Sequence, residues 1–406
     1  MSNSSPTPTT PLSDQEEAAA ILRRCVHCGF CNAVCPTYQL LGDERDGPRG
    51  RIYLLKQLLE GAAATEQTQF HLDRCLSCKS CSSTCPSGVD YGRLADIGRH
   101  QLERQVRRPW PQRLLRQALL SFLPYPQRLT PFFKLGYGLG PLLPLKLKAK
   151  LPAQQPCPTW PTVRHARKIL LLEGCVQRGL TPHIDALAAQ VLDHVGISAI
   201  RQPNAGCCGA INYHLNDPTR GLDFMRRMID SCWPNIANGI EAIVMTASGC
   251  GAQLKEYGHI LRTDPDYAEK AAHFSSLCRD LSEILRHEDL QKIRATPQKI
   301  AFQSPCSLQH GQQLHGVVEA LLQQLGFELL TVADSHLCCG SAGTYSLLQP
   351  ELSEQLRHNK LQHLQKNHPE KIATANLGCL LHLQGQSSPP IVHWVELLAE
   401  ALSAKP

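Results

Sequence analysis

The spacing of apolar residues divides the chain into an N-terminal part and a longer C-terminal part. In the N-terminal part they recur every three or four positions, as in Ile52, Leu55 and Leu58, which is the spacing of amphipathic helices. From about residue 166, short apolar runs at 169–172 and 242–245 alternate with amphipathic stretches. Such runs between helical stretches are typical of buried parallel strands. The pattern therefore predicts helices first and α/β structure afterwards.

The α/β part contains an internal repeat with an offset of 131 residues. Each copy has a cysteine after a predicted strand, a Cys-Cys-Gly triplet 32 positions later, and a Gly-Cys pair further on. Self-similarity of this kind predicts two similar structural units. The matched positions are Cys175 and Cys306, Cys207-Cys208-Gly209 and Cys338-Cys339-Gly340, and Gly249-Cys250 and Gly378-Cys379, the last at an offset of 129.

Cysteine is over-represented, with 19 in 406 residues. The polar N-terminus lacks the charged and apolar segments of a secretory signal peptide, so we expect a cytoplasmic protein with reduced thiols. In that compartment, closely spaced cysteines indicate metal binding or redox chemistry rather than structural disulfides. The odd number of cysteines also argues against simple pairing.

Two motifs of the form C-x2-C-x2-C-x3-C-P lie 50 residues apart. Three cysteines at this spacing bind three irons of a 4Fe-4S cluster, and the fourth reaches across to the neighbouring cluster. Zinc is the alternative, but a zinc site uses two C-x-x-C pairs and gives the third cysteine and the Cys-Pro no role. The predicted ligands are Cys25, Cys28, Cys31 and Cys85 for one 4Fe-4S cluster, and Cys75, Cys78, Cys81 and Cys35 for the other.

The cysteines of the repeat have three interpretations, which the sequence leaves open. Adjacent thiolates can bind different irons of one cluster, they can form a redox-active disulfide, or they can be structural remnants of a duplicated ancestor. The candidates for further iron-sulfur clusters or redox thiols are Cys175, Cys207, Cys208, Cys250, Cys306, Cys338, Cys339 and Cys379. The remaining three, Cys157, Cys232 and Cys278, are expected to be inert.

These motifs predict an α+β multidomain protein, in which an all-helical ferredoxin-like N-terminal domain precedes a duplicated pair of α/β Cys-Cys-Gly domains. The expected divisions are a disordered tail over 1–12, a helical domain with two 4Fe-4S clusters over 13–98, a basic linker rich in proline and aromatic residues over 99–165, a first repeat over 166–290 and a second over 296–404.

The positive charge of the chain is concentrated in one segment. Residues 99–150 contain eleven Lys or Arg against one acid, a net of +10, whereas the whole chain carries +6. Aromatic residues and prolines are interleaved with these cations. We expect this segment to dock on an anionic membrane surface, the alternative being a solvated linker. A transmembrane helix is not expected, because no run of 18 or more apolar residues occurs.

Together, these features resemble the glycolate oxidase iron-sulfur subunit family over about residues 14–400. The segments that carry the resemblance are 24–37, Asp-Gly-Pro-Arg-Gly-Arg-Ile at 46–52, 75–89 and the two Cys-Cys-Gly domains, in this order. Iron-sulfur subunits of glycerol-3-phosphate dehydrogenase, lactate-utilisation proteins and heterodisulfide reductases share parts of the pattern. The heterodisulfide reductase domain ends in C-x-x-C, whereas each copy here keeps one cysteine, Cys250 or Cys379, which puts its unusual clusters in doubt.

The resemblance implies an electron-transfer subunit without catalytic residues of its own. FAD-containing subunits would oxidise glycolate to glyoxylate, and this chain would pass the electrons to a quinone or another acceptor at the cytoplasmic face of the inner membrane. The chain shows no dinucleotide fingerprint, so we expect it to be inactive alone. Alternatives are a lactate or glycerol-3-phosphate dehydrogenase subunit and a thiol-disulfide enzyme. Nucleic-acid binding is not expected, because it requires no relay of two clusters.

Overall fold

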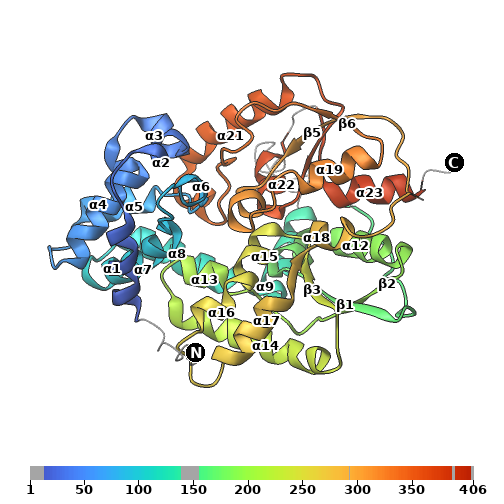
Figure 1. Ribbon diagram of the computed structural model, residues 1–406, viewed down its shortest axis with the longest axis horizontal. Coiled ribbons are helices and arrows are strands. Elements are labelled where there is room, and N and C mark those ends of the chain that lie inside the picture. The colour runs from blue at the N-terminus through green and yellow to red at the C-terminus, as the bar shows by residue number, and fades with distance from the viewer. Residues whose placement is uncertain (1–12, 139–154, 292, 386–388, 404–406) are drawn as a thin grey trace, which may run out of the picture.

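The structure is a computed structural model that describes residues 13–138, 155–291, 293–385 and 389–403. The tail predicted to be disordered, 1–12, and the cations of the basic segment at 146–150 lie outside the described residues. Figure 1 shows the N-terminal helices on one side of the molecule and the two sheets on the other.

The described part of residues 13–138 consists of helices, loops and turns, without strands. The predicted capping box is present, because the Glu16 amide donates to Ser13 Oγ and the Ser13 amide donates to Glu16 Oε2. Apolar faces of α1, α4 and α7 form one buried core around Leu55 and Leu94. The helices are α1 (Asp14–Arg24), α2 (Phe30–Ala33), α3 (Pro36–Leu41), η1 (Glu44–Asp46), α4 (Pro48–Leu59), α5 (Glu66–Asp73), α6 (Ser80–Thr84), α7 (Tyr91–Gln105), α8 (Trp110–Phe122) and α9 (Pro126–Gly138).

The first repeat forms a four-stranded parallel sheet with the strand order β2-β1-β3-β4. The apolar run predicted as a strand is β1, whose residues Ile169 to Leu172 are fully buried. The elements are β1 (Arg167–Leu172), α11 (Cys175–Leu180), α12 (Pro182–His194), β2 (Ile197–Arg201), α13 (Ala210–His214), α14 (Pro218–Ala237), β3 (Ala242–Met245), α15 (Ser248–Lys255), α16 (Tyr257–Ile260), α17 (Ala268–Leu277), β4 (Cys278–Asp280) and α18 (Leu281–Leu285).

The second repeat forms another four-stranded parallel sheet, ordered β6-β5-β7-β8, in which corresponding strands occupy corresponding places. The sequence predicts helices first and parallel α/β units afterwards, and the structure confirms this order. The elements are β5 (Lys299–Gln303), the π-helix η3 (Ser307–Gly311), α19 (Val317–Gln324), β6 (Glu328–Leu330), α20 (Tyr345–Leu348), α21 (Pro350–Gln365), β7 (Lys371–Thr374), α22 (Leu377–Leu383), β8 (Ile391–His393) and α23 (Trp394–Ser403).

The two repeats share one core and are joined at the loops that follow β3 and β7. A single buried cluster contains residues of both sheets, with Ile169 and Val244 from the first and Ile300 from the second. The Ser248 amide donates to the Ala375 carbonyl at 3.2 Å, and the Gly249 amide donates to Asn376 Oδ1 at 3.2 Å. The carboxyl ends of the two central strand pairs therefore face each other.

The predicted basic linker begins inside the helical part. Helix α7 continues across the expected boundary at residue 98, and Arg99 on it is buried, where it donates to the Leu72 and Cys75 carbonyls. Arg108 is also buried and pairs with Asp73 and Glu103. These cations therefore stabilise the helical part and are not available for an external partner. None of the helices in the described ranges is both long and apolar enough to cross a bilayer.

Candidate metal centres

The cysteines of the two ferredoxin-type motifs line two adjoining cavities. The first is lined by all four cysteines that the sequence assigns to one cluster, and the second by all four of the other set. Cys81, Pro48 and Tyr91 line both cavities, so the two sites share a wall. The fourth cysteine of each motif therefore lines the cavity of the other motif. The cavity residues are Cys25, Cys28, Cys31 and Cys85 in the first, and Cys75, Cys78, Cys81 and Cys35 in the second.

The two cysteine loops have matching backbone conformations. The residue before the second cysteine is left-handed in both, at φ 54° for His27 and 51° for Ser77. The residue after it is left-handed as well, at φ 86° for Gly29 and 59° for Lys79. Such turns curl the backbone around its own cysteines, which is how one short loop presents three thiols to one centre.

Two arginines near the second cavity favour the thiolate of Cys75, whereas burial raises the pKa values of Cys78 and Cys81 in the same cavity. Burial raises the pKa of Cys75, but the nearby guanidinium groups of Arg51 and Arg99 outweigh it and lower the pKa of that thiol. In the first cavity, burial and then the charges of the other three thiols raise the pKa of Cys31 to about 11. The cysteine ligands of a cluster are deprotonated, so metal binding must displace the proton of the Cys31 thiol. The donor set fits an iron-sulfur cluster, because the four predicted cysteine ligands line each cavity and the Ser77 amide points at Cys75 Sγ at 3.4 Å.

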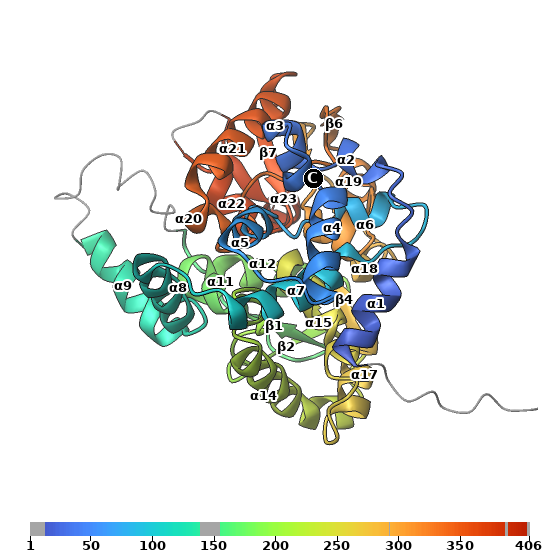
Figure 2. The ribbon, with the colours of Figure 1, turned by 90° about the vertical axis from the view of Figure 1, so that its left-hand side faces the viewer.

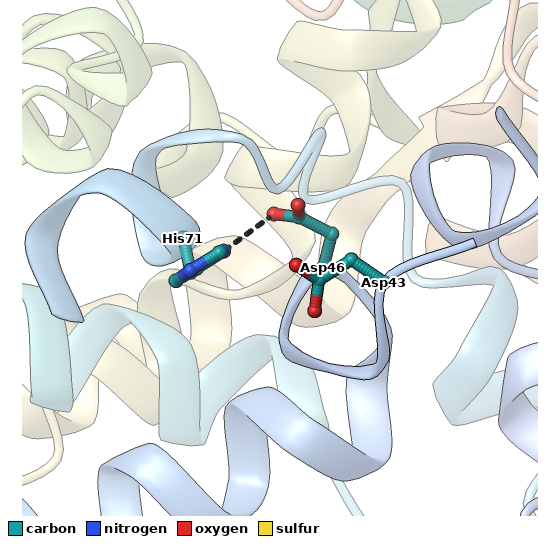
Figure 3. A group of neighbouring side chains, drawn as sticks. All are labelled: Asp43, Asp46 and His71. Atoms are coloured by element: carbon teal, nitrogen blue, oxygen red, sulfur yellow. Dashed lines mark hydrogen bonds and ion pairs between the residues drawn. The ribbon is translucent and has the colours of Figure 1, made fainter. Parts of the chain in front are cut away.

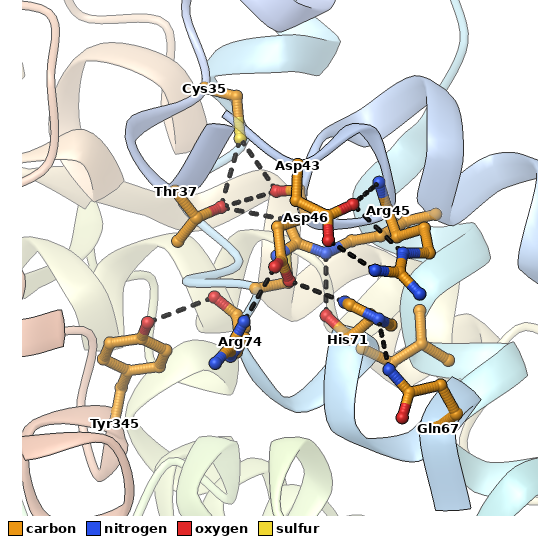
Figure 4. Close-up of polar contacts among 12 residues, drawn as sticks. Cys35, Thr37, Asp43, Arg45, Asp46, Gln67, His71, Arg74 and Tyr345 are labelled. Atoms are coloured by element: carbon orange, nitrogen blue, oxygen red, sulfur yellow. Dashed lines mark hydrogen bonds and ion pairs between the residues drawn. The ribbon is translucent and has the colours of Figure 1, made fainter. Parts of the chain in front are cut away.

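A buried ion network holds Cys35 in place (Figure 4). The Cys35 thiol lies 3.3 Å from Thr37 Oγ1, which donates to the Asp46 carbonyl at 2.8 Å. Arg51 donates to Thr37 Oγ1 at 3.1 Å and to the His71 carbonyl at 2.9 Å. The Asp-Gly-Pro-Arg-Gly-Arg segment of the sequence therefore serves to position a thiol of the neighbouring motif.

Asp43, Asp46 and His71 lie close enough together to suggest a cation site (Figure 3). Their charges already have partners, because Asp46 pairs with Arg74 at 2.8 Å and with His71 at 3.0 Å, while Asp43 pairs with a neighbouring arginine at 2.7 Å. We therefore assign this group to the network that supports Cys35 and not to a metal site.

The eight cysteines of the repeats gather at the carboxyl edges of the two sheets. In each repeat, the connection after the first central strand (β1 or β5) leads to one edge of the sheet, and the connection after the second (β3 or β7) leads to the other edge. Ligand sites of open α/β sheets lie at the point where the strand order reverses in this way. In the first repeat, Cys175 Sγ lies 3.5 Å from Cys207 Sγ, and the Cys208 thiol is within hydrogen-bonding reach of Cys207 and Cys250. These four cysteines form no disulfide, and each thiol is within reach of at least one other of the set.

The second repeat has the same arrangement. Cys306 Sγ lies 3.9 Å from Cys338 Sγ, and Cys339 is within reach of Cys338 and Cys379. The amide of the triplet glycine points at the first triplet cysteine in both repeats, from Gly209 at 3.4 Å and from Gly340 at 3.5 Å. Both glycines have positive φ and would place a Cβ against backbone, which explains why the triplet ends in glycine.

The three cysteines expected to be inert lie away from these sites. Cys232 and Cys278 are buried in the apolar core of the first repeat, and Cys157 is exposed. Burial raises the pKa of Cys232 to about 11. Sequence analysis did not identify Arg51, Arg99 or the buried Lys360 near the second-repeat thiols. A lone cation on a helix resembles a solvated charge, so no sequence pattern distinguishes it.

Comparisons with known proteins agree with this geometry. Residues 21–89 match the 4Fe-4S dicluster domain family, and residues 169–255 and 300–384 match the cysteine-rich domain family twice. Iron-sulfur clusters are therefore the cofactors of this chain, and the zinc alternative is set aside. A crystal structure of a hypothetical protein from Helicobacter pylori, 12% identical, covers 97% of this chain and 73% of its own with a TM-score of 0.58, which shows a similar fold.

Two relatives of known name match almost the whole chain, and a third matches about half of it. The glycolate oxidase iron-sulfur subunit of Escherichia coli (strain K12) is 53% identical, over 95% of each chain. The probable glycolate oxidase iron-sulfur subunit of Bacillus subtilis (strain 168) is 28% identical over 95% of each chain. Lactate utilization protein A of Geobacillus thermodenitrificans is 26% identical and matches 54% of this chain and 91% of its own. By its cysteine arrangement and by this similarity, the chain belongs to the glycolate oxidase iron-sulfur subunit family.

Proposed function

We propose that this chain relays electrons from FAD-containing partner subunits, which oxidise glycolate to glyoxylate, toward a quinone or another membrane acceptor. The observation that carries this proposal is the pair of adjoining cysteine cavities with a common wall. When bound there, two 4Fe-4S clusters supply carriers for single electrons. Glycolate is preferred to lactate as the substrate because the relative named for glycolate oxidation matches 95% of this chain and the lactate-utilisation relatives match about half.

The ligand sets follow from the two cavities. We assign one cluster to the cavity of Cys25, Cys28, Cys31 and Cys85, and the other to the cavity of Cys75, Cys78, Cys81 and Cys35. Arg51 and Arg99 compensate the negative charge of the second set. Pro48 and Tyr91 line both sites. No residue of this chain is assigned a catalytic role, because substrate oxidation belongs to the flavin subunits.

The acceptor side is proposed to face the membrane. Helix α8 exposes Trp110, Leu114 and Phe122, and Figure 2 shows α8 and α9 together at one edge of the molecule. Residues 104–172 contain no aspartate or glutamate, and Arg104, Arg107 and Arg113 are exposed at or near this helix. An apolar stripe flanked by cations suits the headgroup region of an anionic bilayer. The chain would therefore be a peripheral protein on the cytoplasmic face of the inner membrane.

The relay function is tested by separating the chain from its partners. Cluster-loaded chain alone should not reduce a dye with glycolate, and adding the flavin subunits should start the reduction. The same chain should oxidise a chemically reduced viologen dye without them, because the relay itself is intact. Glycolate-dependent dye reduction by the isolated chain would contradict the proposal.

A further inference from the structure

The thiol site of the second repeat touches the ferredoxin-type loops, and that of the first repeat does not. Leu76 and Cys78 of the second cysteine loop pack in one apolar cluster with Cys306 and Cys338. Tyr345, which lies in the same cluster, donates its hydroxyl to the Arg74 carbonyl at 3.1 Å. The second cavity and the second-repeat thiols are therefore neighbours.

The first-repeat thiols have different surroundings. Cys175 and Cys207 pack against Tyr125 and Phe224, and Cys208 lies in the core of its own repeat. Among the described residues, no cysteine of the ferredoxin-type motifs belongs to these packing clusters. Electron transfer slows steeply with distance, so the second-repeat site is the one placed to exchange electrons with the Cys75 cavity.

A buried lysine lies beside the second-repeat thiols. Lys360 on α21 is 4% exposed, and its Nζ donates to the Asp334 carbonyl at 2.8 Å and to the Ser335 carbonyl at 3.4 Å. In the described part of the chain no carboxylate lies within ion-pair distance of this ammonium group. Leu361 and Leu364 of the same helix pack in one apolar cluster with Cys339 and Cys379, which places Lys360 near these thiols. Burial lowers the pKa of the Lys360 ammonium group, and negative charge on the thiols would raise it. A buried cation requires compensation, and an anionic group on these thiols provides it.

The first repeat lacks this cation. Helices α14 and α21 both begin with proline, and the residue ten positions later is Met228 in α14 and Lys360 in α21. Met228 is fully buried. The buried ionisable group near the first-repeat thiols is instead Asp185, whose Oδ1 accepts from Gln177 and Thr246 at 2.6 Å each. The two thiol sites therefore differ in the ionisable group buried beside them, a lysine in the second repeat and a carboxyl group in the first.

We propose that Cys306, Cys338, Cys339 and Cys379 bind a third iron-sulfur cluster in series with the Cys75 site, and that Lys360 compensates its negative charge. This inference rests on the relay function proposed above. One electron leaves the reduced centre at the Cys75 loop and enters the third centre, and no bond or proton is exchanged in that step. The buried ammonium group favours the more negative, reduced state and so makes the third centre an electron acceptor.

Metal analysis of the full-length chain, purified without oxygen, tests the site. Cys338→Ser with Cys339→Ser should remove about four irons with their acid-labile sulfide and one EPR signal, and leave the signals of the two ferredoxin-type clusters. The matched control is Cys232→Ser with Cys278→Ser, which removes two buried thiols outside the sites and should leave the iron content unchanged. An unchanged iron content in the first variant, or zinc in place of iron, would overturn the inference.

A redox titration tests the role of Lys360. Lys360→Met introduces the residue of the first repeat, so the volume is tolerated while the charge is lost. At a fixed ambient potential, the ratio of reduced to oxidised third centre should fall about tenfold, which is a shift of about 59 mV for one electron. Lys360→Arg should retain most of the wild-type ratio, because it keeps the positive charge. The two ferredoxin-type clusters should keep their reduction potentials in both variants. Equal titration curves for wild type and Lys360→Met would refute the role. Both tests use the chain alone, so they remain informative if the flavin partner proves different.

Discussion

Cys35 shows how residues far away in the sequence fix the position of one thiol. Its sulfur lies beside Thr37, and Arg51 holds Thr37 while also binding the carbonyl of His71. The thiol therefore points away from its own motif and into the cavity of Cys75. This position is what a crosswise ligand requires, and removal of the thiol tests it.

Cys35→Ser should damage the cluster of the Cys75 cavity and spare the other cluster. The serine hydroxyl is a poor ligand for iron, so about four irons or the corresponding EPR signal should be lost. The control is Cys157→Ser, which changes an exposed cysteine that lines neither cavity. If the Cys35 variant kept the Cys75 cluster and lost the one at Cys25, the crosswise assignment would be wrong.

Asp185 makes the stability of the first repeat depend on pH. Burial raises the pKa of this carboxyl group to about 7, from 3.8. Between these values the folded protein keeps a proton that the unfolded chain releases, so stability falls as pH rises from about 4 to about 7. The loss amounts to roughly 4 kcal/mol at most, from about three pKa units at 1.36 kcal/mol each.

Asp185→Asn should remove this loss. The amide oxygen can accept the same two hydrogen bonds, and the other carboxyl oxygen has no partner in the structure. The urea midpoint of the variant should match wild type near pH 4 and exceed it above about pH 7.

Asp193 on the same helix is the matched control. Burial raises its pKa, but Arg164 and His165 outweigh burial and lower it, so Asp193→Asn should destabilise at neutral pH. A parallel pH dependence for wild type and Asp185→Asn would exclude this explanation.

Among the elements, α4 has the closest link to both cavities. Its first residue, Pro48, lines both of them, and Arg51 one turn later supports Cys35. Gly50 lies between these residues, and a Cβ there would overlap the Glu44 carbonyl oxygen. The helix can approach η1 this closely only because the side chain is absent.

Gly50→Ala should therefore destabilise the helical part, although alanine normally favours a helix. We expect a cost of about 1 to 3 kcal/mol from overpacking, seen as loss of cluster absorbance at lower urea concentration. Gly92→Ala in α7 is the matched control, because its Cβ would meet only the flexible side chain of Lys79 at 3.1 Å and the Asp90 carboxylate at 3.4 Å. Equal urea midpoints for the two variants would show that the approach of α4 to η1 is not required.

The repeat elements show how far sequence can predict such a site. The offset of 131 residues predicts that corresponding cysteines occupy corresponding places, because equal spacing in equal folds leads to the same sheet edge. It cannot predict which repeat lies against the Cys75 loop, since that depends on packing between segments distant in sequence, such as Tyr345 with Arg74. The buried state of Lys360 and Arg99 has the same origin. Their partners are contributed by loops that become neighbours only in the folded chain.

At the scale of the whole molecule, the helical part lies against both repeats. Arg93 donates to the Tyr213 hydroxyl of the first repeat at 2.7 Å, and Ser83 hydrogen-bonds with His310 of the second at 2.8 Å. The cavities are thus held from two sides, while α8 and α9 extend to one edge (Figure 2). At this edge, α8 and α9 could contact an external surface.

The exposed face of α8 has the composition of an interfacial anchor. Trp110 is 75% exposed and Leu114 63%, which is unusual for large apolar side chains. Arg104, Arg107 and Arg113 are exposed nearby, whereas Arg108 and Arg116 pair with Asp73. Binding should therefore depend on the first three arginines, and replacing the last two would disturb the fold instead.

Co-sedimentation with vesicles tests this surface. The chain should bind vesicles that contain phosphatidylglycerol and not pure phosphatidylcholine, and binding should weaken as the Debye length falls from about 10 Å at 0.1 M salt to about 3 Å at 1 M. Changing Arg104, Arg107 and Arg113 to Gln should weaken it by up to roughly a hundredfold, at about 1 kcal/mol per cation. Changing Arg220, Arg227 and Arg279 to Gln removes as many exposed cations elsewhere and should have little effect. Equal recovery of wild type in the supernatant with both lipids would show that α8 binds no membrane, because neither its cations nor its apolar stripe would then engage the headgroups.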